Sequence, residues 1–235
     1  MPLSAERTSL DQADLIIRTA RPADRDALRT LCVDTAYFGE PCEAFFPDRE
    51  FLADLIMEYY IRYEPHHTWI AQYQGEIVAY LSAGFDEAGY TRIMLKNILP
   101  GAILRALGRG RIWDRRTVKL IGYNFMSFIS GQTRLPAGDH RAYPVHIHQN
   151  TRQGFRGKGI GRKLLEAFLD TVKKEQALGV RFRALRGEPC FPFFDTYGFK
   201  RLACRRVKYW ERWLKKSPLY FMEYGKIFDD TQKKR

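Results

Sequence analysis

Residues 149–162 read QNTRQGFRGKGIGR, and this stretch decides the fold. The alternating run Val145–Gln149 before it predicts a strand, and apolar residues recurring at helical spacing after it predict a helix. Glycines in between allow φ > 0, and the first turn of a helix offers free N–H groups to an anion. The stretch therefore predicts a phosphate cradle, to which Arg156, Lys158 and Arg162 add positive charge.

The spacing of the glycines distinguishes this loop from two common phosphate-binding motifs. The stretch contains no Gly-x-x-x-x-Gly-Lys-Ser/Thr, and no acidic residue ends a following strand at the distance that a dinucleotide fingerprint requires. The order Arg156-x-x-Gly159-x-Gly161, which opens a helix after a strand, resembles the pyrophosphate-binding motif of the GNAT acetyltransferase superfamily. The alternative is a plain strand–loop–helix connection whose glycines serve only a tight turn.

Three further segments resemble the same superfamily. Residues 16–26, IIRTARPADRD, are similar to its usual opening strand and helix, and residues 193–199, FFDTYGF, are similar to its short helix ending in Tyr-x-x-x-Gly-Phe. The run His146-Ile147-His148, with Asn150, resembles the subgroup that includes the acetyltransferase-like domain of O-GlcNAcase and bacterial relatives. The resemblance covers about residues 14–226.

The resemblance implies an α/β (α+β) GNAT fold: a mixed, mostly antiparallel seven-stranded sheet, splayed between strands four and five and flanked by helices. We expect residues 14–228 to form a single domain, with a loose N-terminus (1–13) and a charged tail (229–235). The other strands are predicted at 15–19, 68–73, 77–85, 180–185, 202–209 and 219–227, with helices at 22–32 and 47–63.

A helical insertion, about 86–141, is predicted between strands three and four, where the superfamily has a short turn. The spacing of its apolar residues favours helices at 98–107 and 113–129. The segment is too short to form a separate domain with its own hydrophobic core. We expect it to pack on its own domain as a lid or flank. Because the first helix is basic and rich in leucine, a membrane surface or a partner helix is the alternative.

The resemblance also implies acetyl-CoA as the cosubstrate. In the superfamily, the backbone at 149–151 would hold the pantetheine arm and thioester, and the loop at 156–162 would hold the pyrophosphate. The implied coenzyme residues are Gln149, Asn150, Thr151, Arg156, Gly157, Lys158, Gly159, Ile160, Gly161 and Arg162. Gln149 replaces an apolar residue of the subgroup, and a polar side chain there can still point outward.

The loop after the first predicted helix, together with the second helix, forms one wall of the acceptor site in the superfamily. Candidate acceptor contacts are Tyr37, Glu40, Tyr60, Tyr63 and His146, with Asp34 beside them. The alternative for each tyrosine is a packed aromatic whose hydroxyl is satisfied. The candidate general bases, in order, are Glu40, His148 and Asp34, and His148 is expected to titrate near neutral pH.

The position of the catalytic acid departs from the superfamily. Its usual tyrosine is Phe194 here, which cannot donate a proton, and Gly187 stands where asparagine is frequent. Either another group acts, or the thiolate leaves unaided, or the protein does not catalyse. The leading hypothesis is an acetyl-CoA-dependent N-acetyltransferase that transfers the acetyl group directly to an unidentified amine in a ternary complex. The alternative is a catalytically degenerate GNAT module that binds coenzyme A or another ligand without turnover.

Composition narrows the class of partner. The 235 residues carry a net charge of +12, which suits an anionic partner or a solvated basic surface. A basic module acting on RNA is a third hypothesis, but the aromatic residues do not alternate with basic ones, so nucleic acid is not favoured. No signal peptide, membrane span or metal spacing is apparent, and the cysteines are expected to be reduced thiols of a cytoplasmic monomer or homodimer. These cysteines are Cys32, Cys42, Cys190 and Cys204.

Overall fold

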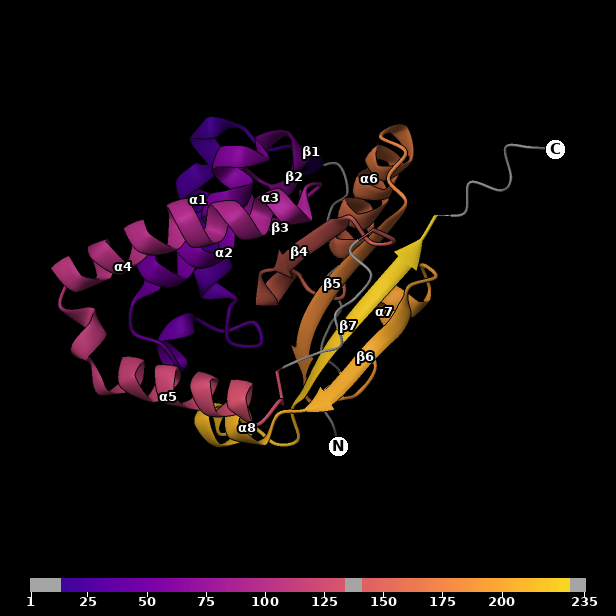
Figure 1. Ribbon diagram of the computed structural model, residues 1–235. Coiled ribbons are helices and arrows are strands. Elements are labelled where there is room, and N and C mark those ends of the chain that lie inside the picture. Colours follow the sequence, from indigo (N-terminus) through magenta and orange to yellow (C-terminus); the bar gives the residue numbers. More distant parts are fainter. Residues whose placement is uncertain (1–13, 134–140, 229–235) are drawn as a thin grey trace, which may run out of the picture.

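The computed structural model describes residues 14–133 and 141–228, and its centre is one mixed sheet (Figure 1). The sheet has seven strands in the order β1-β2-β3-β4-β5-β7-β6, and every neighbouring pair is antiparallel except β4 and β5. The predicted fold class is therefore confirmed. The strands are β1 (Leu15–Thr19), β2 (Thr68–Tyr73), β3 (Glu76–Gly84), β4 (Val145–Thr151), β5 (Gly179–Arg186), β6 (Lys200–Arg206) and β7 (Tyr220–Ile227).

Strands β4 and β5 separate soon after they begin. They are in register only at Val145↔Val180 and His146↔Arg181. Beyond that point β4 continues against β3 as far as Thr151, while β5 pairs with β7 along its whole length. The predicted splay is present, and it leaves one edge of β4 facing away from any strand that the structure describes.

Helices cover both faces of the sheet (Figure 1). On one face α6 buries Ile160, Leu164 and Phe168 against residues such as Val145 and Ile147. On the other face α1 and α2 pack Leu28, Leu31 and Met57 against Ile70 and Tyr80. The helices are α1 (Arg25–Asp34), α2 (Arg49–Tyr63), α3 (Glu87–Ile93), α4 (Leu99–Gly108), α5 (Arg115–Ile129), α6 (Ile160–Lys174), α7 (Pro192–Asp195) and α8 (Lys208–Leu214).

Side chains alternate between these two faces along β4. Val145, Ile147 and Gln149 point toward α6, whereas His146 and His148 point toward α1, α2 and α3. The two histidines therefore share the face on which the acceptor was expected.

The insertion spans from α2 to α8 (Figure 1). Arg105 of α4 and Arg109, the residue that follows α4, bind two buried carboxylates of the α2 region, Asp54 and Asp48, each at 2.8 Å. Both predicted helices of the insertion are present within a few residues. No helix in the part of the chain that the structure describes is long and apolar enough to cross a bilayer.

Two short helices, α3 and α8, were not predicted. Gly89 and Thr91 weaken the helical pattern of α3, but the Asp86 side chain caps it by accepting a hydrogen bond from the Gly89 N–H at 2.8 Å. The strand predicted at 202–209 ends at Arg206, and α8 follows because its apolar residues pack beneath β7. In both helices the tertiary contacts outweigh a weak local signal.

Candidate active site

The loop between β4 and α6 has the open backbone that the glycine pattern predicted. Gly157 and Gly159 adopt left-handed conformations, with φ of 73° and 81°. A Cβ added at either position would meet nothing within 4 Å, so it is the positive φ, and not a lack of space, that favours glycine here. Gly159 is also the N-cap of α6, whose first-turn N–H groups and helix dipole favour an anion. Lys158 and Arg162 are exposed beside it.

Gln149 supports this loop from inside. Its side chain does not point outward: it lies under α6, and its Nε2 donates a hydrogen bond to the Gly161 carbonyl at 3.0 Å. A Cβ at Gly161 would approach the same Nε2 to 2.9 Å, so a larger residue there would displace the Gln149 amide. The Gln149 Oε1 is buried without a hydrogen-bond partner among the described residues.

Arg156 connects the phosphate loop to the acceptor loop. Its Nε donates to the Thr151 carbonyl at 2.9 Å, and its Nη1 donates to the Phe38 carbonyl at 3.0 Å. The guanidinium therefore braces the end of β4 against residues 35–40, in addition to adding charge near the cradle. Sequence reasoning missed this second role because residues 38 and 156 are far apart along the chain.

On the acceptor face, His148 shares a polar cluster with Tyr80 and Asn150. The Tyr80 oxygen lies 3.0 Å from His148 Nδ1 and accepts from Asn150 Nδ2 at 3.2 Å. Burial, together with the nearby His146, lowers the pKa of His148 to about 4. The expectation that His148 titrates near neutral pH is therefore wrong, because the imidazole is held neutral by removal from water.

His146 belongs to a second polar cluster, at the point where β4 and β5 separate. Its Nδ1 lies 2.8 Å from the Glu87 carboxylate, and the other carboxylate oxygen accepts from Arg181 at 2.6 Å. Burial opposes ionisation of Glu87, but His146 and Arg181 hold its pKa below the usual range. Arg181 also pairs with Glu223, which is 1% exposed. Sequence reasoning missed this cluster, although a glutamate inside the apolar strand β7 was a signal for it.

Two predicted acceptor tyrosines lie beside this cluster on α2. Tyr60 is buried 5.6 Å from the His146 ring, and burial raises its pKa well above 10. Tyr63 is 37% exposed, stacks on Tyr59, and accepts a 3.4 Å hydrogen bond from Asn97. Only Tyr63 of the two offers its side chain to solvent.

The other acceptor candidates lie in the loop after α1. The Tyr37 hydroxyl donates to the Leu214 carbonyl of α8 at 2.6 Å, so this proton is already used. Glu40 is exposed, and its backbone pairs with that of Tyr37 in a tight turn. Asp34 accepts a hydrogen bond from Arg49 at 2.6 Å, at the end of α1. The structure does not bring Asp34 and His148 into one hydrogen-bonded group.

The region of the expected catalytic acid is a hydrophobic core. Phe194 is 5% exposed and packs 4.1 Å from the Phe182 ring. The Tyr197 hydroxyl, one residue before Gly198, donates to Glu166 of α6 at 3.0 Å, so it packs away from β4 as expected. Neither residue offers a proton in the splay.

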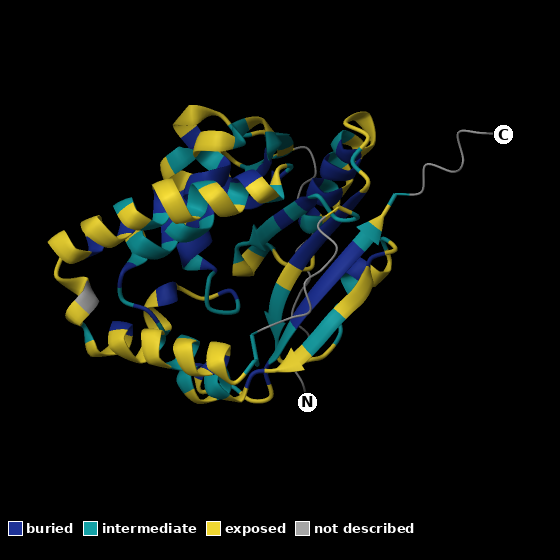
Figure 2. Ribbon diagram, viewed as in Figure 1, coloured by how far each residue is buried: buried dark blue, intermediate teal, exposed yellow. Residues whose placement is uncertain are grey.

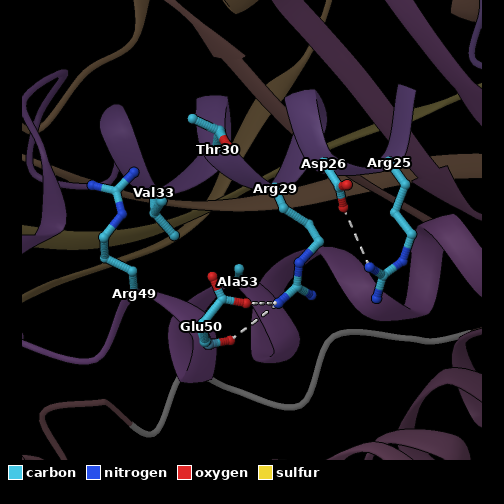
Figure 3. Close-up of a pocket in the computed structure, with 8 residues that line it drawn as sticks. All are labelled: Arg25, Asp26, Arg29, Thr30, Val33, Arg49, Glu50 and Ala53. Carbon is cyan, nitrogen blue, oxygen red and sulfur yellow. Dashed lines mark hydrogen bonds and ion pairs between the residues drawn. The ribbon is translucent and has the colours of Figure 1, made fainter. Parts of the chain in front are cut away.

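A separate pocket of about 170 Å³ lies between α1 and α2 (Figure 3). Its arginines are already paired: Arg29 binds Glu50 and Asp54, and Arg49 binds Asp34 and Glu43. The pocket is therefore an ion-paired seam that joins the two helices, and it is distinct from the phosphate cradle.

The cradle and the β4 edge fit the diphosphate and pantetheine of coenzyme A. An anion at the start of α6 would meet backbone N–H groups and two exposed cations, and an extended amide chain could pair with the free edge of β4. No group of three or more His, Cys, Asp or Glu within residues 14–133 and 141–228 could hold a metal ion.

Comparison with known proteins shows the same fold. No family model and no curated protein match the chain. The crystal structure of the protein SsHAT is 22% identical over 91% of this chain and 98% of that chain, with a TM-score of 0.66. A Drosophila melanogaster polyamine N-acetyltransferase, which catalyses the formation of N-acetylagmatine, is 14% identical over 92% of this chain and 100% of that chain, with a TM-score of 0.55.

A third structure contains the expected ligand. The protein yncA from Salmonella typhimurium, solved with its cofactor acetyl-CoA, is 14% identical over 92% of this chain and 95% of that chain, with a TM-score of 0.54. These identities are low, so the likeness concerns the fold. Together with the strand order, the splay and the glycine cradle, it shows that this chain has the fold of the GNAT N-acetyltransferases.

Proposed function

We propose that this chain is an acetyl-CoA-dependent N-acetyltransferase that transfers the acetyl group directly to an amine in a ternary complex. One observation carries the proposal: the loop with the left-handed Gly157 and Gly159, at the start of α6, adjoins the edge of β4 that faces no described strand. A diphosphate and an extended pantetheine arm need these two features side by side. The acetyltransferase likeness of the fold supports the same conclusion.

The residues of the cradle would bind and orient the coenzyme. The first-turn N–H groups of α6 donate to an anion, Lys158 and Arg162 neutralise its charge, and Gln149 holds the loop in place. The backbone of residues 149–151 would align the arm and present N–H groups to a carbonyl oxygen that gains charge. Acetyl-CoA supplies a thioester carbonyl with a good leaving group.

The attacking amine must lose a proton, and we retain Glu40, His148 and Asp34 as candidate bases. His148 lies on β4 itself and is neutral at physiological pH, but a pKa of about 4 makes it a weak base. We propose that His148 accepts a hydrogen bond from an amine that arrives already neutral. Glu40 is exposed and suits proton release through water, whereas Asp34 is occupied by Arg49.

Five residues remain candidate acceptor contacts: Tyr37, Glu40, Tyr60, Tyr63 and His146. Glu40 and Tyr63 are the exposed members, so we expect them to contact the acceptor directly. The ring of Tyr37, the buried Tyr60 and the half-buried His146 would shape the wall behind it. Agmatine is a suitable first probe, because the similar Drosophila enzyme forms its acetyl derivative.

The alternative function is a module that binds coenzyme A without turnover. Its support is specific, because the buried Phe194 occupies the position of the usual acid and the splay contains no tyrosine at that point. The two functions differ only in chemistry, since both use the same cradle.

The test measures binding and turnover separately. Calorimetry with coenzyme A measures the affinity of the cradle. Acetyl transfer is measured as the release of free thiol from acetyl-CoA in the presence of agmatine, other amines or short peptides. Cys190 and Cys204 are partly exposed free thiols, so runs without acceptor give the background. Acceptor-dependent thiol release supports the enzyme. Binding without release supports the alternative module, and the absence of both overturns the coenzyme site.

We also propose that the protein acts in the reducing cytoplasm, as a monomer or homodimer without a nucleic-acid partner. All four cysteines are free thiols, and Cys32 and Cys42 are buried. Burial raises the pKa of both buried thiols to about 12, so they are unreactive.

A further inference from the structure

The inserted helices expose an unusual amount of apolar surface. Among the described residues, eleven of the sixteen exposed large apolar side chains lie between Leu95 and Ile129. Val118, Ile121, Phe125 and Ile129 recur at helical spacing along α5, and each is 49–61% exposed. Thr117 and Ser127, on the opposite side of the same helix, are buried. Helix α5 therefore turns its apolar face toward solvent. Figure 2 shows most of this helix as exposed.

Large apolar side chains are also exposed in the segment before α5. Trp113 lies in the turn between α4 and α5 and is 78% exposed, and Leu104 on α4 is 69% exposed. A tryptophan that exposes its ring at the margin of an apolar face is typical of proteins that bind at a membrane interface.

The same segment is strongly basic. Residues 95–131 contain seven Lys and Arg against one acidic residue, Asp114. Three of these cations have partners within the protein. Arg105 binds Asp54, Arg109 binds Asp48, and Arg116 donates to the Glu43 carbonyl. Three other cationic side chains near α5 form no ion pair and no side-chain hydrogen bond with any described residue. They are Arg111, Arg115 and Lys119.

We propose that this surface binds an anionic lipid membrane. We define the lipid-facing surface as Leu104, Trp113, Val118, Ile121 and Phe125, with the cations Arg111, Arg115 and Lys119. The apolar side chains would enter the headgroup boundary, and the cations would meet lipid phosphates. A second copy fits less well, because it would place two strongly basic segments against each other. The inference does not depend on acetyl transfer.

The experiment uses the full-length chain and vesicle flotation. Vesicles of phosphatidylcholine alone are compared with vesicles of equal parts phosphatidylcholine and phosphatidylglycerol. We expect flotation with the anionic vesicles and much less with the neutral ones. Raising the salt should weaken flotation, since exposed charges are screened.

Two variants separate the apolar and the charged contributions. I121Q/F125Q should lower the partition coefficient on anionic vesicles by about tenfold or more, because each side chain loses its apolar burial. R115Q/K119Q should lower it by about tenfold on anionic vesicles only. Ile16→Gln is the matched control, because Ile16 on β1 is 55% exposed and Ile121 is 58% exposed. Circular dichroism and thermal melting confirm that each variant is folded.

Three outcomes would overturn the proposal. The first is that the wild-type chain does not float with anionic vesicles. The second is that Ile16→Gln lowers flotation as much as I121Q/F125Q does. The third is that light scattering finds a dimer, that I121Q/F125Q dissociates it, and that vesicle binding is absent. This result would assign the surface to a second copy of the chain.

Discussion

The hydroxyl oxygen of Tyr80 lies 3.0 Å from Nδ1 of His148 and accepts a hydrogen bond from the Asn150 amide at 3.2 Å. Tyr80 is fully buried, so its single proton must go to a protein acceptor, and the two acceptors beside it are His148 Nδ1 and the Cys32 thiol. If Tyr80 donates to His148, the imidazole carries its own proton on Nε2. If Tyr80 donates to Cys32, its oxygen accepts from both Asn150 and His148. His148 then carries its proton on Nδ1, and Nε2 presents a lone pair.

This arrangement predicts the protonation state of His148. Long-range ¹H–¹⁵N NMR should show a neutral ring with Nδ1 protonated from pH 8 to about pH 5, because the pKa is lowered to about 4. His67 provides an internal comparison, since hydrogen bonds to Glu64 and Glu175 raise its pKa. A His148 midpoint near 6.5, or a proton on Nε2, would contradict the assignment.

The lowered pKa of His148 also predicts how stability depends on pH. The unfolded chain binds this proton below about pH 6.5, whereas the folded chain binds it only below about 4. Between these values the unfolded state holds more protons, so stability falls as pH falls. The loss attributable to His148 should be on the order of 2 kcal/mol by pH 4.5. Urea unfolding of His148→Leu should lack this part of the decline, and equal slopes for both proteins would refute the idea.

Removal of the Tyr80 hydroxyl should affect both stability and turnover. Tyr80→Phe leaves the Asn150 amide without its partner and should lower the free energy of unfolding by about 1–3 kcal/mol. The coenzyme affinity should remain, because the cradle is on the other side of β4, while kcat falls. Tyr209→Phe is a control, since the Tyr209 hydroxyl makes no hydrogen bond to another described residue, and only its backbone N–H is bound, by Gln132. Unchanged kcat in a folded Tyr80→Phe protein would remove Tyr80 from the mechanism.

The coenzyme cradle can be tested with two matched glycines. Gly159 and Gly75 have φ of 81° and 86°, and neither has an atom within 4 Å of an added Cβ. Valine at either position should cost similar stability, about 1–2 kcal/mol, because the backbone strain is the same. Only Gly159→Val should weaken coenzyme A binding in calorimetry, by about tenfold or more, because it obstructs the helix N-terminus. Equal affinities for the two variants would argue against the cradle.

The contact between Gln149 and Gly161 predicts a coupling between two substitutions. Gly161→Ala alone forces the Gln149 amide away from its 3.0 Å hydrogen bond, and Gln149→Ala alone removes that bond. The second substitution makes room for the first, so the double variant should be more stable than the sum of the two effects predicts, by about 1 kcal/mol. Urea unfolding measures the cycle. Additivity within about 0.3 kcal/mol would show that Gln149 does not support the loop.

The sequence by itself determined the strand–loop–helix unit, the seven strands and the two longer helices of the insertion, α4 and α5. These features depend on short-range physics: the period of apolar residues, and the need for glycine where φ is positive, as at Gly159. Phe194 could also be identified as unable to donate a proton, since that follows from the residue type alone.

Only the tertiary structure decided what the polar residues of the site do. Gln149 points inward because α6 lies over β4, and Tyr37 is held by a carbonyl of α8 that is 177 residues away. The pKa of His148 falls because folding removes the ring from water, and the pairing of Glu87 with Arg181 joins the insertion to β5. Burial and contacts between distant segments appear only when the sheet brings those segments together, so a pattern of neighbouring residues cannot encode them.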